Sequence, residues 1–368
     1  MAKDKLNIAF FGSSIVSAYW NGAATYYRGI VKALHKMGHE VTFYEPDILE
    51  RQEHRDIDDP EWCHVIVYQE DKLSLRGLLR KAQEESDVII KASGVGAFDE
   101  FLEEEVAKMK SRDNLIIFWD VDAPATLDRI EKDENDPFRK LIPQYDFILT
   151  YGGGQPVIDA YNNNGAQKCI PVYNALDTDT HYPVDAEKRF EGTLAFLGNR
   201  LPDREARVEE FFLNPAGDLP DHKFLLGGSG WGDKPMPDNV DYVGHVYTKD
   251  HNAFNCTPMA VLNISRDSMA RYGFSPATRV FEAAGAGACI ITDYWKGIAT
   301  FFEPGEEIIV VKSGEEVKNV LSELTLEEAE KIGKAAYKKV LEKHTYEHRA
   351  ELLESVISRK LHNQSEDV

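Results

Sequence analysis

The sequence predicts an α/β protein made of two doubly wound domains, each built on a parallel β-sheet covered by helices. Its 368 residues exceed what one ordinary hydrophobic core organises and suit two domains of roughly 150 to 200 residues. Short apolar runs, typical of buried strands, alternate with stretches of helical periodicity, which is the pattern of βαβ units. A Pro- and Asp-rich segment, residues 171–183, separates two such series.

The first series begins with residues 6–12 (LNIAFFG), a continuous apolar run that predicts a buried strand. In residues 24–37 apolar side chains recur every three or four positions, which predicts a helix. Gly38 then stands where a left-handed residue ends a helix, and residues 39–45 (HEVTFYE) return as a strand. Further strands of this series are expected at 87–93 (DVIIKAS), 114–119 (NLIIFW) and 146–151 (DFILTY).

The second series contains six apolar runs that predict strands, again with helical stretches between them. They are residues 193–198, 222–228, 240–246, 259–265, 288–293 and 307–311. A last amphipathic helix is expected over 346–361. We therefore place the first domain at 1–175, completed by a returning helix at 346–362, and the second domain at 185–345.

Composition limits the partners and the location of the protein. With 63 acidic and 42 basic residues the formal net charge is −21, so a nucleic acid would be repelled and is not expected as a partner. No apolar run is long enough to span a bilayer, and no leader-like segment opens the sequence, so a cytoplasmic location is expected. The four cysteines form no CxxC pair and are interpreted as reduced thiols.

Residues 271–295 (RYGFSPATRVFEAAGAGACIITDYW) are the most informative stretch. Ser275 as N-cap and a proline at the first helical position predict a helix start, whose free N–H groups would suit a pyrophosphate. Glu282 lies one to two turns further along and offers two oxygens for the vicinal hydroxyls of a ribose. Thr278 and Arg279 belong to the same predicted first turn, and Arg279 supplies a cation for phosphate. The alternative is an ordinary αβ unit with a glutamate facing solvent.

This stretch resembles the donor-binding region of GT-B glycosyltransferases near glycosyltransferase family 4. It is closer still to the CgeB-like group, whose members read R-V-F-E-A followed by small residues and glycine, as residues 279–283 do here. The resemblance implies a GT-B architecture, with two Rossmann-like domains facing a central cleft and a C-terminal helix crossing back to the first domain. It also implies that Glu282 binds the nucleotide ribose. Family 4 enzymes carry an E-x7-E pair, and here the first glutamate is replaced by Phe274.

Three further segments match the same family residue by residue. After the first strand of the second domain, Arg200 fits the first of two cations that hold the donor diphosphate, and Arg204 replaces the second, a lysine. His245 lies in the loop where such enzymes hold the nucleobase. In the first domain Gly22 matches the first glycine of a paired-glycine loop approaching the donor, and Ala23 replaces the second. For Arg200 and Arg204 the alternative is a pair of solvated surface side chains.

Asp120 and Asp122 end a predicted strand of the first domain, two residues apart, so both project the same way if the strand continues. Related enzymes place a polar residue that touches the transferred sugar here, and we expect one of the two to contact sugar or acceptor, or to act as base in an inverting reaction. A turn held by aspartate is the alternative. GT-B enzymes use helix dipoles and cations in place of a bound metal, so the resemblance implies no metal and no cofactor.

The sequence as a whole predicts a glycosyltransferase that moves a sugar from a nucleotide-diphosphate sugar to an unidentified acceptor. Two rivals share the architecture: a nucleotide-sugar 2-epimerase and a non-catalytic protein that binds nucleotide sugars. A nicotinamide dehydrogenase is disfavoured because no G-x-G-x-x-G fingerprint is present. The isolated histidines, His181 among them, are interpreted as structural, since no H-x-x-x-H or comparable pairing occurs.

Overall fold

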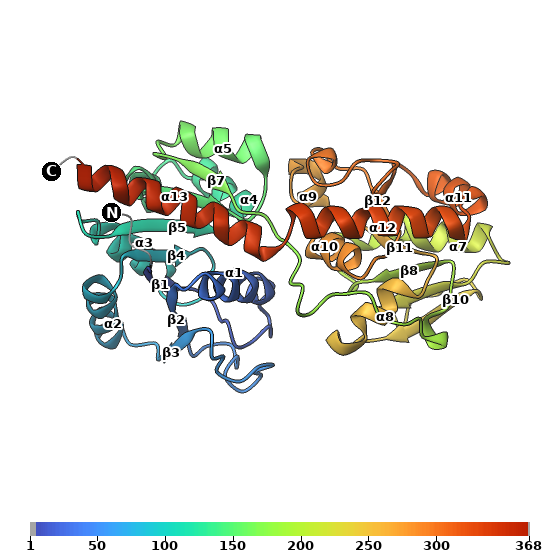
Figure 1. The fold of residues 1–368 in the computed structure, drawn as a ribbon, viewed down its shortest axis with the longest axis horizontal. Coiled ribbons are helices and arrows are strands. Elements are labelled where there is room, and N and C mark those ends of the chain that lie inside the picture. The colour runs from blue at the N-terminus through green and yellow to red at the C-terminus, as the bar shows by residue number, and fades with distance from the viewer. Residues whose placement is uncertain (1–4, 367–368) are drawn as a thin grey trace. The chain divides into compact units, whose positions relative to one another are not determined.

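The protein folds into two compact units, each with its own parallel sheet (Figure 1). The structure, a computed structural model, describes residues 5–366, without the side chains of 267, 268 and 363–366. Residues up to Tyr173 and from Tyr346 onward form unit 1, and Asn174–Thr345 form unit 2. The expected return of the last helix to the first domain is confirmed.

The sheet of unit 1 has seven parallel strands in the order β3-β2-β1-β4-β5-β6-β7. The strands are β1 (Asn7–Phe11), β2 (Glu40–Pro46), β3 (His64–Tyr68), β4 (Val88–Ala92), β5 (Leu115–Asp120), β6 (Phe147–Thr150) and β7 (Cys169–Pro171). The strand order reverses direction between β1 and β4, as in a Rossmann sheet. The sequence patterns located five of these strands, and β3 and β7 were not predicted.

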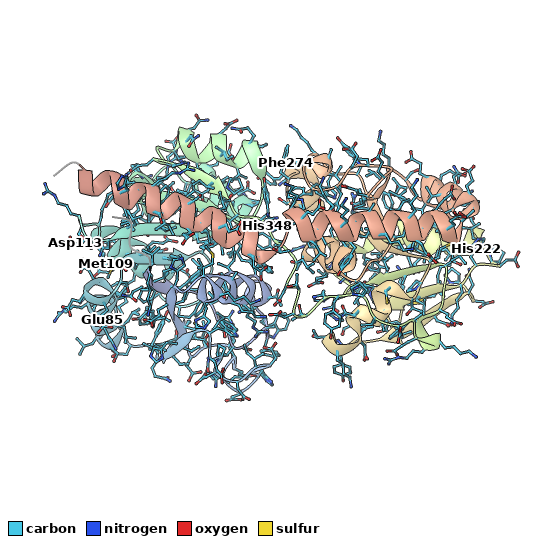
Figure 2. The ribbon with its side chains drawn as sticks, viewed as in Figure 1. Glu85, Met109, Asp113, His222, Phe274 and His348 are labelled. Atoms are coloured by element: carbon cyan, nitrogen blue, oxygen red, sulfur yellow. The ribbon has the colours of Figure 1, made fainter. Side chains whose placement is uncertain are left out.

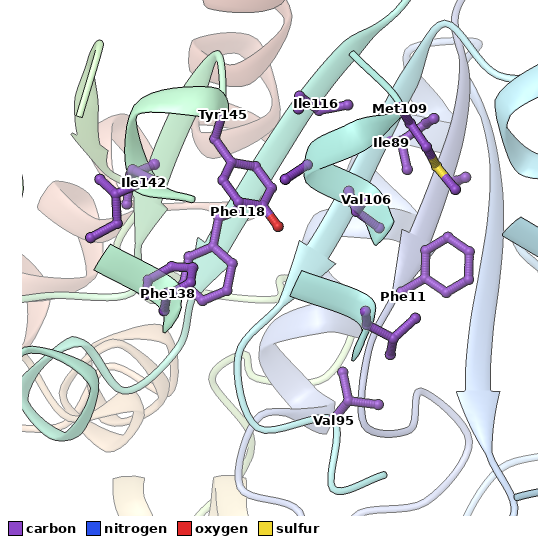
Figure 3. Close-up of a cluster of buried hydrophobic side chains, with 14 of the residues drawn as sticks. Phe11, Ile89, Val95, Val106, Met109, Ile116, Phe118, Phe138, Ile142 and Tyr145 are labelled. Carbon is purple, nitrogen blue, oxygen red and sulfur yellow. The ribbon is translucent and has the colours of Figure 1, made fainter. Parts of the chain in front are cut away.

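Alternation along each strand sends side chains to two different helical layers. One face of the sheet packs against α2 (Lys72–Glu85), α3 (Asp99–Lys108), α4 (Ala123–Lys132) and α5 (Gly154–Asn163). Figure 3 shows part of this core, where Phe118 lies between Phe138 and Tyr145 with ring centroids 4.4 and 5.6 Å away. On the same face β1 contributes Ala9 and Phe11.

The other face carries an aromatic core, covered by α1 (Ala24–Lys36) and α13 (Tyr346–Glu366). Phe10 is the centre of this core, with ring centroids 5.0 to 5.6 Å from three other aromatic rings, those of Tyr27, Phe43 and Trp119. Helix α13 docks where α1 has Gly29, because a side chain at that position would overlap the Tyr346 ring. The C-terminal helix is therefore a built-in layer of unit 1.

Unit 2 repeats the same topology with six parallel strands in the order β10-β9-β8-β11-β12-β13. They are β8 (Leu194–Leu197), β9 (Phe224–Gly227), β10 (Val240–Gly244), β11 (Ala260–Asn263), β12 (Ile290–Asp293) and β13 (Ile309–Val311). All six lie within the runs predicted from sequence. The direction of strand order reverses between β8 and β11.

The helices of unit 2 also form two layers. One face is covered by α6 (Glu205–Val208), a π-helical stretch (Glu209–Leu213), α7 (Asn214–Asp218) and α11 (Gly314–Glu323). The other helices are α8 (His251–Cys256), α9 (Asp267–Tyr272), α10 (Thr278–Gly285) and α12 (Leu326–Lys343), with α10 packed against both α8 and α12. No helix among the described residues is both long and apolar enough to cross a membrane.

Two helical glycines give a test of how α13 docks. Where a helix has open space around it, alanine is more favourable than glycine by about 1 kcal/mol. Gly77 of α2 is such a position, because a Cβ added there would meet nothing within 4 Å. At Gly29 the same atom would lie 2.2 Å from the Tyr346 ring. We expect Gly77→Ala to raise the melting temperature slightly and Gly29→Ala to lower it in thermal unfolding. A Gly29→Ala protein as stable as the wild type would contradict the docking of α13.

Candidate functional site

Both sheets offer their ligand-binding edge at a reversal of strand order, since the loops after two neighbouring strands diverge there. In unit 2 this point lies between β8 and β11. The segments that follow are residues 198–204 and residues 264–277, the second of which includes α9, and they carry three of the donor-binding residues expected from sequence. The fold therefore places Arg200, Arg204 and Ser275 on loops that leave adjacent strands.

The loop after β8 is locked against the loop after β9. Gly228, at φ +116°, lies so close to the carbonyl of Gly198 that a side chain there would overlap it. The Trp231 indole N–H donates to the same carbonyl at 2.8 Å, and Ser229 N–H donates to Asn199 at 2.9 Å. This interlocking fixes the backbone from which the next arginines project.

Arg200 is already neutralised by acidic neighbours. Its guanidinium donates two hydrogen bonds of 2.8 Å to the carboxylate of Glu205 and one of 3.0 Å to Asp233. Glu205 also accepts from Lys234 at 2.9 Å, and the two cations lower the pKa of Glu205 to about 2. The side chain predicted to hold the donor diphosphate is thus part of an ion-pair network on the protein itself.

Arg204 and Arg279, in contrast, influence each other electrostatically, and neither has an ion-pair partner among the described residues. Among the described residues no carboxylate approaches either guanidinium within ion-pair distance, although Arg204 donates to the Asn199 carbonyl at 2.6 Å. Burial, and then the like charge of Arg279, lower the pKa of Arg204 to about 10. Burial also lowers the pKa of Arg279, with the Glu282 carboxylate acting in the opposite direction. Two partly buried cations whose charges act on each other would favour an anion bound near both.

The start of α10 differs from the sequence prediction. The helix begins at Thr278 with Ala277 as N-cap, so Ser275 is not the cap and the following proline is not in the first turn. The Ser275 hydroxyl instead donates to the carbonyl of Gly273 at 3.0 Å within an irregular loop. No side chain caps α10, which leaves N–H groups of its first turn, at Thr278 and Arg279, available to a ligand.

Phe274, labelled in Figure 2, occupies the position of the missing first glutamate. Its φ of +47° is unusual for a residue with a side chain, and its N–H donates to the Lys296 carbonyl at 2.6 Å. The ring packs so closely on Gly297 that any larger residue there would overlap it. The loop before α10 is therefore held in a strained shape by packing.

Glu282 lies one turn after Thr278 on the half-buried side of α10. One ring nitrogen each of His181 and His251 and a carboxylate oxygen of Glu282 all lie within 4.8 Å of one another. Burial chiefly lowers the pKa of His251, assisted by Arg279 and His181 and opposed by Glu282. Sequence analysis missed this grouping, because the three residues are separated by 70 and 31 positions and form no motif.

His245 follows β10, the edge strand on this side of the sheet. Its ring is exposed and contacts Tyr247 edge to face with centroids 4.6 Å apart. The next residue, Val246, is buried, and its carbonyl lies 3.2 Å from the Nε2 atom of His251. The loop expected to hold a nucleobase is thus connected to the histidine pair.

In unit 1 the loop after β1 lies at the corresponding reversal of strand order. Gly22 is exposed with open space around its Cα, and Ala23 is the N-cap of α1 without any side-chain cap. The preceding Asn21 is buried and donates to the carbonyls of Ser14 and Ser17 at 2.7 and 2.9 Å. These bonds fix the loop that leads into the N-terminus of α1.

The two aspartates after β5 do not project together. Strand β5 ends at Asp120, which is fully buried, and Asp122 is the exposed N-cap of α4. Asp120 accepts hydrogen bonds from four groups: Ser93 Oγ at 2.8 Å, the Asp122 N–H at 3.0 Å, Thr126 Oγ1 at 3.1 Å and the Tyr161 hydroxyl. A carboxylate so enclosed has no free edge for a substrate, which corrects the expectation for Asp120. Asp122 alone is open to solvent.

Residues 204–355 match a protein-family model described as glycosyl transferase-like. A search of curated proteins finds no match.

Solved glycosyltransferase structures share the fold at low sequence identity. Anabaena HepE, solved with UDP and glucose, has a TM-score of 0.65 at 13% identity, covering 96% of this chain and 100% of its own. Sucrose-phosphate synthase from Thermosynechococcus elongatus has a TM-score of 0.68 at 14% identity, covering 97% and 99%. The phage T4 enzyme BGT, solved with its substrate UDP-glucose, has a TM-score of 0.58 at 12% identity, covering 98% and 99%.

The chain therefore has the GT-B fold, and residues 204–355, which cover most of unit 2, are similar to the glycosyl transferase-like family. The two Rossmann-like domains expected from sequence are confirmed. The subgroup resemblance and the individual site residues stay predictions.

The enclosure of Asp120 has a consequence for stability that can be measured. Burial raises the pKa of this carboxyl above its usual value of about 3.9, against the lowering effect of its hydrogen-bond donors. A carboxyl whose pKa is raised by folding contributes its full stabilisation of the folded state at a pH below its pKa in the unfolded chain. That contribution is lost as the pH rises through its pKa in the folded protein. An asparagine does not titrate. We expect the melting temperature of Asp120→Asn, relative to wild type, to rise between pH 4 and pH 7, and a pH-independent difference would contradict this.

Proposed function

We propose that this protein is a glycosyltransferase that moves a hexosyl group from a UDP-sugar to an acceptor without a catalytic metal. The observation that carries the proposal is that Arg204 and Arg279, which have no ion-pair partner among the described residues, lower each other's preference for the charged form near the uncapped start of α10. Two desolvated guanidinium groups and free helix N–H groups suit a diphosphate, which carries the charge they lack. UDP is chosen because HepE and phage T4 BGT were both solved with it or its glucose derivative.

In this proposal each donor-binding residue has a distinct role. Arg204, Arg279 and the N–H groups at Thr278 bind the diphosphate, and Glu282 accepts hydrogen bonds from the ribose hydroxyls. The loop at His245 lies against the uracil. Ser275 shapes the loop before α10, and Arg200 supports the loop after β8 through Glu205.

The reaction needs little more than charge stabilisation and a base. The acceptor hydroxyl attacks the anomeric carbon, the bond from that carbon to the diphosphate breaks, and UDP leaves with the electron pair. The two arginines and α10 stabilise the negative charge that develops on UDP. Asp122 takes the acceptor proton, as expected for an inverting transfer. Gly22 and Ala23, which carry little or no side chain, leave the backbone of the loop after β1 open to a ligand.

The acceptor is proposed to be neutral or cationic and not a nucleic acid. One structural neighbour, a β-glucosyltransferase, is described as a DNA modifying enzyme, whereas this chain has a net charge of −21. A hollow of about 460 Å³ near the ends of β2 and β3 is lined by acidic side chains, namely Asp47, Glu50, Glu53 and Glu70. Such a surface repels polyanions.

The proposed location is the cytoplasm. The four cysteines are free thiols, as is usual for proteins of that reducing compartment.

One assay separates this function from its two rivals. The full chain is incubated with UDP-glucose and other UDP-hexoses, with and without a panel of sugar acceptors, and UDP release is followed together with the sugar products. A transferase releases UDP faster with its acceptor, a 2-epimerase interconverts the sugars, and a non-catalytic binding protein does neither. Absence of UDP release under all conditions would refute the transferase.

Glu282→Ala tests the ribose contact. Removing hydrogen bonds at a partly desolvated site costs about 1 to 3 kcal/mol, so UDP should bind roughly 5- to 150-fold more weakly. Isothermal titration with UDP measures the change, and the melting temperature of the free protein serves as the control for folding. Equal affinity in wild type and variant would remove Glu282 from the site.

Arg204→Gln and Arg200→Gln form a matched pair, because both arginines leave the same loop. We expect the Arg204 variant to lose at least about tenfold in UDP affinity, as for loss of a charge-assisted bond. The Arg200 variant should keep most of its affinity, since that guanidinium is bound by Glu205 and Asp233. Titration with UDP at two salt concentrations distinguishes them. The opposite order would show that Arg200 exchanges its partners for the donor.

A further inference from the structure

The histidine pair beside Glu282 is built from three separate segments of unit 2. His181 lies in the segment before β8, His251 begins α8, and Glu282 lies on α10. Their three ligand atoms are within 4.8 Å of one another, and the two imidazole rings are 6.0 Å apart between centroids. No sequence motif assigns a role to this group.

The segments are held together by the neighbouring Asn252. Its side-chain amide donates to the carbonyl of Thr180 at 3.1 Å and accepts from the N–H of Tyr182 at 3.4 Å, so it clamps the backbone on both sides of His181. Close packing acts from the other side, because a side chain at Gly285 of α10 would lie 3.2 Å from the His181 carbonyl. The arrangement is therefore preorganised.

One nitrogen of each imidazole lies within hydrogen-bond distance of an oxygen, which favours one tautomer of each ring. The Thr180 hydroxyl lies 3.1 Å from the Asp177 carbonyl, to which it can donate, and 2.9 Å from His181 Nδ1; when it donates to that carbonyl it accepts from Nδ1–H, and His181 Nε2 keeps its lone pair. That Nε2 atom is buried and has no partner among the described residues, and His181 as a whole is only 7% exposed. The Val246 carbonyl can only accept, so it takes the proton of His251 Nε2 and leaves the Nδ1 lone pair free.

The two imidazoles and the Glu282 carboxylate thus converge, and the buried His181 Nε2 atom without a partner is unfavourable unless a cation binds it. Two imidazoles and a carboxylate match the preferences of zinc-like ions, with metal–ligand distances of about 2.0 to 2.2 Å. A hydroxyl and a backbone carbonyl orient the imidazoles through their second nitrogens, as outer-sphere groups do in metal sites. We propose that His181, His251 and Glu282 bind a divalent transition-metal ion such as Zn²⁺, with one coordination position left for water.

This site has a consequence for the donor. Glu282 cannot bind the metal and the ribose hydroxyls with the same oxygens. A bound metal ion should therefore weaken UDP binding. This part of the inference rests on the proposed function. Arg279 acts on the two ligands in opposite directions. Its positive charge lies near the cluster and repels a metal ion, whereas it attracts a diphosphate.

The test begins with the full chain, freed of metal by chelator and titrated with Zn²⁺ alone and with Co²⁺ alone. We expect one tight site per chain and, for Co²⁺, the visible absorption of a four-coordinate ion. His181→Ala and His251→Ala should each lose more than about tenfold in affinity. His35→Ala, an exposed histidine of unit 1, is the control and should bind like wild type.

Two further variants guard against misfolding and alternative ligands. Thr180→Val keeps both imidazoles and removes only the exposed hydroxyl that orients His181, so it should weaken Zn²⁺ about 10- to 100-fold. Arg279→Gln should raise the affinity for Zn²⁺ and lower the affinity for UDP. If the cluster binds only the ribose, the variant should show a lower affinity for UDP and no binding of Zn²⁺. Zn²⁺ should reduce the affinity for UDP more in the wild type than in Thr180→Val. Free UDP also binds Zn²⁺ in solution, but it does so equally in both samples, so the difference between the two proteins reports on the site.

The outcomes separate the two proposals. Histidine-dependent Zn²⁺ binding without any UDP binding would leave the metal site standing and refute the proposed function. UDP binding with no Zn²⁺ site, or with a Zn²⁺ site unaffected by His181→Ala, His251→Ala and Thr180→Val, would refute the metal site alone.

Discussion

Parallel strands impose the constraint on which the rest of this structure depends. All strands of a parallel sheet end at the same edge, and where the strand order reverses, the loops on either side diverge and leave an open edge. In unit 2 this occurs between β8 and β11, and in unit 1 between β1 and β4. The residues with unusual charge or conformation, including Arg204, Arg279 and Phe274, lie on loops or helix starts at that edge.

Buried polar groups then give these loops a single shape. Asp120 fastens the end of β5 to β4, α4 and α5, and Asn21 fastens the loop after β1. At the end of β12 Asp293 is enclosed in the same way, accepting from the Ser265 N–H and paired with Arg207. Each such group would be costly without its partners, so the networks select one loop conformation.

The sequence predicted most of the fold, because buried parallel strands are continuous apolar runs that stand out from amphipathic helices. It missed β3, whose burial is partial, and β7, which has only three residues. Site prediction was weaker. The sequence motif led to Arg204, Arg279 and Glu282, but it could not show that Arg200 is occupied by Glu205 and Asp233. That information depends on contacts between residues up to 33 positions apart.

The same limit explains the helix start and the histidine pair. Ser275 followed by proline is a favourable helix start by local rules. The structure instead has an irregular loop there, in which Phe274 packs closely on Gly297, and α10 begins only at Thr278. His181, His251 and Glu282 meet only through tertiary folding. In both places tertiary contacts decide an arrangement that the local sequence does not reveal, as is common at functional sites.

The repulsion between Arg204 and Arg279 also affects the lifetime of the protein. Two like charges held together in a partly dry environment raise the free energy of the empty folded state, and an anion that binds both removes this cost. By mass action the folded fraction then increases with the concentration of that anion. In a cell, chaperones and proteases act on the unfolded fraction, so the abundance of this protein would follow the supply of its own ligand.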